Sequence, residues 1–280
     1  MDNCIILVNK ERGVSSNKVV NTVKFLLQAK KAGHLGTLDV LGEGLLPVTI
    51  GKATKLFDYF LNKDKVYKTV FKFGETTDTL DLEGEIHKMD DKHITMDMVS
   101  SVLAEFIGKQ EQMPPAFSAK KIKGKKAYEL AREGKEVVLK RKEIEIYDIQ
   151  CLRELEENKF EFLVHCSSGT YIRSLCRDLA QRLSTYGVMY AIQRTKCGIF
   201  DISNSYTIDD IKNNNFKCVM MDDVFDYQKI FLTKNQFEDL SNGKKVSYEK
   251  DGEYRAFYED LFLGVVVVKD SNMKFKIRLF

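Results

Sequence analysis

Residues 33–51 read GHLGTLDVLGEGLLPVTIG and hold five of the 17 glycines of the chain within 19 positions. This density of glycine favours a loop whose backbone takes unusual angles and lets a partner approach closely. Asp39 lies in this loop between Leu38, Val40 and Leu41, so a carboxylate is set among apolar side chains. An Asx turn or a helix cap would use an aspartate in the same way, and the loop alone leaves this alternative open. We expect the loop to carry a site.

Two familiar sites do not fit this loop. A Walker phosphate loop needs four residues between its glycines and a Ser or Thr after its lysine. Gly44 and Gly51 are separated by six residues, and the lysine that follows Gly51 precedes an alanine. A hydrolase built on His34 and Asp39 would need a Ser or Cys nucleophile on a sharp turn, and no such turn is recognisable.

The periodicity on either side of the loop predicts a mixture of strands and helices. Short apolar or alternating runs predict strands at 5–8, 66–73, 137–149 and 160–166. Helical spacing predicts helices after Ser15-Ser16 and at 53–61, 95–106, 127–132 and 170–183. Because strands and helices do not alternate regularly, we expect an α+β fold with a mixed sheet.

The last part of the chain has a pattern of its own. A short helix at 235–240 is followed by strands near 254–258, 261–268 and 275–279. The 53 residues of 228–280 are few for an independent core. We therefore expect two domains, a main domain at 1–227 and a small β module at 228–280 that packs against it.

The formal net charge of +3 hides a strong segregation of charge along the chain. Residues 118–142 carry ten basic and three acidic side chains, whereas residues 75–111 carry three basic and ten acidic ones. A solvated lysine-rich loop and a phosphate-contacting surface both fit the basic segment. We expect the acidic segment to lie mostly away from a polyanionic partner. On the second interpretation, the lysines that contact phosphates are Lys120, Lys121, Lys123, Lys125 and Lys126.

The placement of cysteine and histidine argues against a metal site. The six cysteines include no C-x-x-C pair, and the four histidines are scattered. The N-terminus lacks the basic and apolar regions of a secretory signal, and no apolar run approaches the roughly 20 residues of a spanning helix. We expect a cytoplasmic protein with reduced thiols, no metal and no membrane association.

A series of short motifs runs through residues 33–175 in a fixed order. They are GHLGTLD (33–39), GLLP (44–47), GKATK (51–55), KVY (65–67), TTDTLD (76–81), QMPP (112–115), GKKAY (124–128) and SGTYIRSL (168–175). This combination closely resembles the tRNA pseudouridine synthase B family, over roughly residues 5–200. The β tail is similar to the PUA-like module of that family in position and strand pattern, so the resemblance implies a pseudouridine synthase catalytic domain at 1–227 and a PUA-like RNA-binding module at 228–280.

The chain departs from the family pattern at two places. Val40, Gly42 and Glu43 stand where the family usually has Pro, Ala and Thr, and Ile-Gln-Arg-Thr at 192–195 replaces Leu-Arg-Arg-Thr. Without the proline, the loop after Asp39 is less rigid, and Glu43 adds a second carboxylate. Neither change touches Asp39 itself.

The resemblance implies an isomerase that converts uridine into pseudouridine at position 55 in the T-loop of tRNA, without a cofactor. It assigns the nucleophile to Asp39, which attacks C6 or C1′ or assists a glycal route, and the sequence leaves these routes open. It also names Arg173 as the partner that keeps the carboxylate ionised. Arg173 stands out locally as well, because the helix expected at 170–183 places it in the first turn, where the helix dipole disfavours a cation.

The target uridine must leave its stack to be reached. The resemblance implies that Tyr67 stacks on the uracil and helps to remove the C5 proton, that Tyr171 and Ile192 line the flipped nucleotide, and that His34 supports the vacated space. We expect the T-arm of tRNA as the partner of a monomer that needs no guide RNA. A guide-dependent synthase would carry longer basic tails. The alternative is a non-catalytic tRNA-binding or tRNA-folding protein on the same scaffold, which would not need Asp39 and Arg173.

Overall fold

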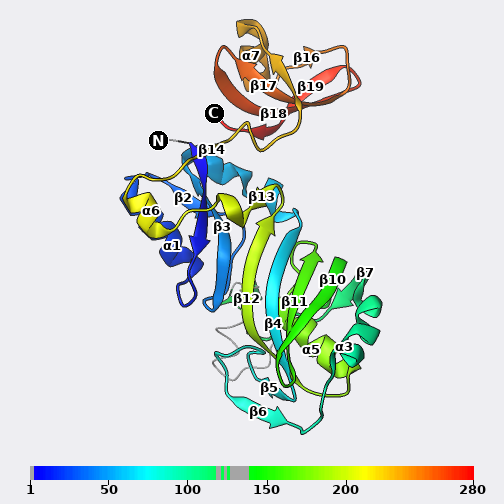
Figure 1. The fold of residues 1–280 in the computed structure, drawn as a ribbon. Helices are drawn as coiled ribbons and strands as arrows, with labels where there is room; N and C mark the ends of the chain where they lie inside the picture. The colour runs from blue at the N-terminus through cyan, green and yellow to red at the C-terminus, as the bar shows by residue number, and fades with distance from the viewer. Residues whose placement is uncertain (1–2, 118–120, 123–124, 127–138) are drawn as a thin grey trace.

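The computed structural model describes residues 3–117, 121–122, 125–126 and 139–280. Its largest element is a mixed ten-stranded sheet, in which eight strands follow the order β14-β1-β3-β12-β4-β11-β10-β7 (Figure 1). β2 pairs with β3, and β13 pairs with β12. The strands are β1 (Cys4–Lys10), β2 (Ala32–His34), β3 (Gly42–Ile50), β4 (Lys65–Phe73), β7 (Gly108–Gln112), β10 (Lys142–Glu156), β11 (Lys159–Cys166), β12 (Gly187–Cys197), β13 (Phe200–Asp201) and β14 (Val219–Met220).

Helices cover this sheet in two places. The α-helices and 3₁₀ helices (η) of this part of the chain are α1 (Ser16–Leu26), η1 (Gly51–Leu56), α2 (Phe57–Leu61), α3 (Met96–Leu103), η2 (Ala104–Phe106), α5 (Ile172–Arg182), η3 (Ile202–Asn204) and α6 (Ile208–Lys212). α3 and α5 share one core with β4, β10 and β11, and α1 shares another with β1 and β3. Ser15 caps α1 as predicted, since its side chain accepts a hydrogen bond from the Lys18 backbone N–H. The helix expected at 53–61 is split into the 3₁₀ turn η1 and the short helix α2.

The glycine-rich segment is only partly a loop, which corrects the prediction for its second half. Residues 42–50 form β3, a nearly fully buried strand between β1 and β12. Gly44 has φ +94°, and a Cβ built on it would lie 2.5 Å from the Arg194 carbonyl oxygen. Glycine is therefore required here for two reasons, because the backbone takes a positive φ and because β12 approaches closely. Asp39 remains in the connection between β2 and β3, as expected.

β12 was not predicted, although it is eleven residues long and lies at the centre of the sheet. It runs parallel to β3 and antiparallel to β4, which makes the sheet mixed. Its sequence alternates poorly because it has apolar and polar residues buried together, among them Ile192 and Arg194. The strand is thus held by its neighbours more than by its own pattern.

Two small sheets lie outside the main one. β5 (Glu75–Thr77) pairs with β6 (Ile86–Met89), and β8 (Lys121–Ile122) pairs with β9 (Lys125–Lys126). The helix expected at 127–132 lies outside the described residues. The strand expected from 137 begins at Lys142, and residues 137–138 are not described.

The C-terminal residues form a separate five-stranded sheet in the order β15-β17-β18-β19-β16 (Figure 1). Its elements are β15 (Gln228–Phe231), α7 (Lys234–Ser241), β16 (Val246–Ser247), β17 (Gly252–Tyr258), β18 (Leu261–Lys269) and β19 (Asn272–Arg278). Phe257, Phe262 and Leu279 of this part share a buried cluster with Ile5 and Phe60 of the main part. The β module therefore packs against the rest of the chain, as its small size predicts.

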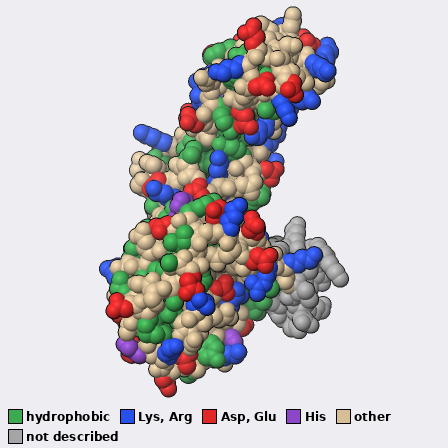
Figure 2. All heavy atoms as spheres, turned by 90° about the vertical axis from the view of Figure 1, so that its right-hand side faces the viewer, with side chains coloured by type: hydrophobic (Ala, Val, Ile, Leu, Met, Phe, Trp, Pro, Cys, Tyr) green, Lys and Arg blue, Asp and Glu red, His purple; other side chains and the backbone are tan. Residues whose placement is uncertain are grey.

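Acidic and basic side chains are interspersed on the face of the molecule shown in Figure 2, over both the main part and the β module. The residues described on this face therefore form no surface of one sign. Of the five lysines expected to contact RNA, Lys120 and Lys123 lie outside the described residues. The backbones of Lys121, Lys125 and Lys126 belong to β8 and β9.

Candidate active site

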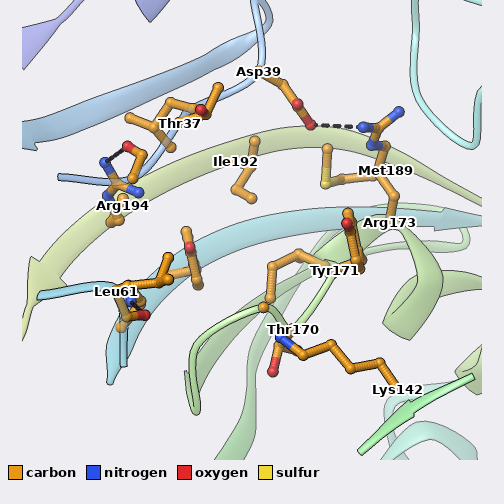
Figure 3. A pocket seen from close by; sticks show the side chains of 16 residues that line it. Thr37, Asp39, Leu61, Lys142, Thr170, Tyr171, Arg173, Met189, Ile192 and Arg194 are labelled. Atoms are coloured by element: carbon orange, nitrogen blue, oxygen red, sulfur yellow. Dashed lines mark hydrogen bonds and ion pairs between the residues drawn. The ribbon is translucent and has the colours of Figure 1, made fainter. Parts of the chain in front are cut away.

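A cavity of about 650 Å³ opens beside the loop that carries Asp39 (Figure 3). Its walls come from the β2–β3 loop, from β4 and β12, and from the start of α5. Three of the residues that were predicted to contact the substrate line it, namely Tyr67, Tyr171 and Ile192. A pocket of this size, with apolar walls and a few polar groups, suits a small ligand or a single extruded nucleotide.

Asp39 and Arg173 meet at this cavity, as the resemblance implied. The Asp39 carboxylate oxygen Oδ2 lies 3.0 Å from Arg173 Nη2 (Figure 3). The Asp39 side chain is 46% exposed, whereas that of Arg173 is 9% exposed. The structure therefore presents a solvent-accessible carboxylate paired with a nearly buried guanidinium.

Arg173 is held in place by a second carboxylate, which the sequence analysis missed. Arg173 Nη1 lies 3.2 Å from Asp81 Oδ2 and donates a hydrogen bond of 3.1 Å to the Thr79 carbonyl. Asp81 is almost completely buried and also accepts hydrogen bonds from Thr79 Oγ1 and from the Glu83 backbone N–H. Its place in the TTDTLD motif was the available signal, but nothing in that motif indicated its partner.

Part of the acidic segment lies at the site and not away from it. A neighbouring cavity of about 580 Å³ is lined by Asp39 and Arg173 on one side and by acidic residues of the 75–111 segment on the other. Those acidic residues are Asp78, Asp81, Glu83 and Glu85. Residues 78–85 thus lie beside Asp39, and the expectation that the segment as a whole lies mostly away from a polyanionic partner stays a prediction.

The start of α5 explains how Arg173 reaches its position. The helix begins at Ile172 with Tyr171 as its N-cap, so Arg173 lies in the first turn as predicted, although Ser168 and Thr170 do not cap the helix. Instead, Gln112 from β7 accepts a hydrogen bond of 2.8 Å from the Tyr171 N–H and donates one of 3.2 Å to the Tyr171 carbonyl. The unfavourable interaction of Arg173 with the helix dipole is offset by the two carboxylates beside it.

Tyr67 projects from β4 into the same cavity. Burial raises the pKa of its phenol to about 12, although the nearby Arg194 guanidinium favours the ionised form. Arg194 is itself buried and donates hydrogen bonds of 2.8 Å to the Leu45 carbonyl and 3.0 Å to the Gly36 carbonyl. Arg194 thereby ties β12 to β3 and to the loop before Asp39.

His34 was predicted to support the space that a flipped base leaves. It lies on β2 and lines the neighbouring cavity together with Asp39. Burial, and then the nearby Arg194 guanidinium, lower the pKa of its imidazole, so His34 is neutral at physiological pH. The structure thus brings His34 close to the loop but into a different cavity from Tyr67.

Lys10, at the end of β1, hydrogen-bonds to the loop that carries Asp39. The sequence did not predict this role. Lys10 is 1% exposed, and its Nζ donates hydrogen bonds to the carbonyls of Glu11, Val40 and Gly42. Burial lowers the pKa of Lys10 to about 8, although the Asp39 carboxylate nearby favours the charged form. Its sequence position, at the end of an apolar strand, gave no sign of this role.

The buried Lys10 gives the protein a predictable dependence of stability on pH. Its pKa is about 8 in the fold and 10.5 in the unfolded chain, so between these values the unfolded chain binds the proton more tightly. The free energy of unfolding should therefore rise with pH across this window. From pH 7 to pH 11 we expect it to rise by about 3 kcal/mol more in the wild type than in a Lys10→Met variant. Urea denaturation of both proteins measures this difference, and parallel pH profiles would contradict it.

Within the residues that the structure describes, no group of three His, Cys, Asp or Glu side chains is arranged to hold a metal ion. The described helices are also too short or too polar to cross a membrane.

Comparison with known proteins places this geometry in a family. A family model described as TruB family pseudouridylate synthase (N terminal domain) matches residues 24–172. The chain is 36% identical over 274 residues to tRNA pseudouridine synthase B of Francisella philomiragia subsp. philomiragia, which covers 94% of this chain and 90% of that protein. It is 34% identical over 287 residues to tRNA pseudouridine synthase B of Clostridium kluyveri, with 99% of each chain covered.

Two solved structures show the same fold. A structure of an H/ACA RNP bound to a substrate RNA containing 2′-deoxyuridine matches with a TM-score of 0.71 at 20% identity, over 99% of this chain and 85% of that chain. The archaeal box H/ACA sRNP Nop10–Cbf5 complex matches with a TM-score of 0.70 at 19% identity, over 99% and 86%. These structures confirm the α+β fold with its mixed sheet and C-terminal β module. With the family model spanning more than half of its residues and curated relatives matching nearly all of them, the chain belongs to the TruB family of pseudouridylate synthases.

Proposed function

We propose that this chain converts the uridine at position 55 in the T-loop of tRNA into pseudouridine, with Asp39 as the nucleophile. Family membership makes the chain an isomerase of uridine, and its curated relatives are named for tRNA. The observation that supports the role of Asp39 is its half-exposed carboxylate at the edge of a 650 Å³ cavity, on the nearly buried guanidinium of Arg173. No observation favours the non-catalytic alternative.

The reaction breaks the N1–C1′ bond, turns the uracil and forms a C5–C1′ bond, with no redox change. A carboxylate nucleophile is sufficient for these steps if it is ionised and correctly placed. Arg173 supplies the placement, because its guanidinium pairs with Asp39 and is fixed by Asp81 on its other side. Attack at C6, attack at C1′ and the glycal route all remain compatible with this placement.

The cavity provides the space into which the uridine is flipped. Tyr67, Tyr171 and Ile192 supply apolar surface from three different elements, so the base is enclosed on several sides. Flipping requires the base to lose its stacking in the T-loop, and stacking on an aromatic ring offsets part of that loss. We propose Tyr67 as that ring, because it lines the cavity from β4, the strand next to β12.

A Tyr67→Phe variant tests whether the phenol does more than stack. With a pKa of about 12 the phenol is protonated at rest, so it accepts the C5 proton only as it gives up its own. We expect the variant to bind tRNA normally and to release tritium from C5-labelled uridine about 10²- to 10⁴-fold more slowly. A rate equal to wild type would limit Tyr67 to stacking, which a Tyr67→Leu variant examines separately.

The wider organisation of the protein is proposed on the same basis. Residues 1–227 are the catalytic domain, and 228–280 form a PUA-like module that adds RNA contacts beside it. The lysines of the 118–142 segment contact the phosphates of the T-arm. We propose that the protein acts in the cytoplasm as a monomer on tRNA, without guide RNA, metal or cofactor.

Mapping of the product tests the proposed reaction and its position together. An unmodified tRNA transcript is incubated with the protein, treated with a carbodiimide that remains attached to pseudouridine, and copied by reverse transcriptase. We expect one new stop that corresponds to position 55, and none with a transcript that has cytidine there. A stop at another uridine would contradict the position, and the absence of any stop would contradict the activity.

A further inference from the structure

Ser16 makes a pair of hydrogen bonds to the residue directly before the proposed nucleophile. Its Oγ donates a hydrogen bond of 2.8 Å to the Leu38 carbonyl and accepts one of 2.9 Å from the Leu38 N–H. Ser16 is the first residue of α1 and is only 3% exposed. One hydroxyl thus serves both polar backbone groups of Leu38, at a point where the chain has left β2 and has not yet entered β3.

The loop also has backbone supports on both sides of Asp39. Arg194 donates a hydrogen bond to the Gly36 carbonyl, and the Gly42 N–H donates one of 3.0 Å to the Asp39 carbonyl. On the far side of Asp39, the carbonyl of Val40 accepts hydrogen bonds from the Gly13 N–H and from Lys10 Nζ. On the near side, the Leu38 side chain is buried in the core that also contains Val19 and Val20 of α1. Asp39 is therefore held between two anchored residues, and Ser16 binds the backbone of the one directly before it.

We propose that Ser16 is a positioning residue for catalysis, which sets the direction of the Asp39 carboxylate by fixing the backbone of Leu38. The inference rests on the proposed role of Asp39 as the nucleophile. Arg173 is already fixed by Asp81 and by the Thr79 carbonyl, so the Asp39–Arg173 distance of 3.0 Å depends on the loop. A displacement of the nucleophile by about 1 Å is enough to slow an enzymatic reaction by about 10²-fold.

Ser15 offers a matched control in the adjacent position. Its Oγ accepts a hydrogen bond of 3.2 Å from the Lys18 N–H, so it caps α1, and among the described residues the hydrogen bonds to the Leu38 backbone come from Ser16 and not from Ser15. Loss of either serine hydroxyl should weaken the start of α1. Only the loss of the Ser16 hydroxyl leaves the buried N–H and carbonyl of Leu38 without their partner.

The test measures the single-turnover rate of tritium release, the dissociation constant for tRNA and the melting temperature of four proteins. These are wild type, Ser15→Ala, Ser16→Ala and Ser16→Thr, assayed well below the lowest melting temperature. We expect Ser16→Ala to slow the reaction about 10- to 100-fold with tRNA affinity within twofold of wild type. Ser15→Ala should keep the wild-type rate, although its melting temperature also falls. Ser16→Thr keeps the hydroxyl and should recover most of the rate.

Three results would overturn the proposal. They are a wild-type rate for Ser16→Ala, an equal loss of rate in Ser15→Ala, and a loss confined to tRNA affinity. If Ser16→Ala does not fold, Ser16→Cys replaces it, because a thiol has nearly the same shape as the serine hydroxyl but forms weaker hydrogen bonds. A wild-type rate for Ser16→Cys would then contradict the proposal. Failure of the proposed function is distinguishable, since the wild-type protein would then release no tritium.

Discussion

Replacing Asp39 with asparagine is expected to lower the rate of pseudouridine formation by at least about 10⁴-fold. The amide has the shape of the carboxylate but cannot act as a nucleophile towards C6 or C1′. Its oxygen can still accept a hydrogen bond from Arg173, so the loop should keep its position. Because Asp39 is half-exposed, the substitution should change the free energy of unfolding by less than about 0.5 kcal/mol. Initial rates of tritium release, with tRNA affinity measured by filter binding, check this expectation.

Glu43 provides the control for a general effect of charge. It is the other carboxylate of the segment, and its Oε1 lies 3.4 Å from Gln193 Nε2 on β12. A Glu43→Gln variant removes one negative charge near the site without touching Arg173. We expect its rate to stay within a few-fold of wild type. If it matched the loss in Asp39→Asn, the effect would belong to local electrostatics and not to a nucleophile.

Removal of Arg173 is expected to have the second largest effect, on both rate and stability. Its guanidinium bridges Asp39 and Asp81. The ammonium of a lysine could not bind both carboxylates in the same geometry. We therefore expect Arg173→Lys to lower the rate by about 10²- to 10³-fold. Arg173→Met leaves Asp81 buried without its cation, and breaking a buried pair in this way costs about 3–5 kcal/mol of folding stability. Urea denaturation and single-turnover rates measure the two effects.

A double variant separates these two effects. In Arg173→Met/Asp81→Asn the unpaired buried charge is removed together with the cation. We expect most of the lost stability to return, because the penalty arises from the isolated carboxylate. Activity should stay low, because Asp39 still lacks its partner. Recovery of activity along with stability would show that Arg173 acts only through the fold.

The sequence predicted those elements whose pattern is set by their own residues. The strand at 66–73 and the helix at 170–183 were placed within a few residues, since alternation and helical spacing reflect one buried face. β3 and β12 were missed because each strand is stabilised by contacts with the other, and these contacts leave no periodic pattern in either sequence. Gly44 suggests a loop in the sequence, but in the structure the backbone of β12 packs against it. β12 has an irregular pattern because its buried Arg194 donates a hydrogen bond to the Leu45 carbonyl of β3.

In the candidate site too, the sequence predicted residues that lie in recognisable motifs and missed residues whose roles depend on distant partners. Asp39, Tyr67 and Arg173 were predicted because they lie in motifs that resemble a known family, and the structure brings all three to one cavity. Asp81 and Lys10 were missed because they act on groups from distant parts of the chain, a guanidinium 92 residues away in one case and loop carbonyls in the other. A buried polar side chain carries no mark in the sequence until its partners are known.

The central claim, that Asp39 is the nucleophile of a uridine isomerase acting on tRNA, is tested most directly by one end-point measurement. A tRNA transcript with tritium at C5 of the uridine at position 55 is incubated with an excess of wild-type or Asp39→Asn protein. Wild type is predicted to release close to one equivalent of tritium per tRNA, and Asp39→Asn none above background although it binds the same tRNA. Complete release by Asp39→Asn at the wild-type rate would contradict the account.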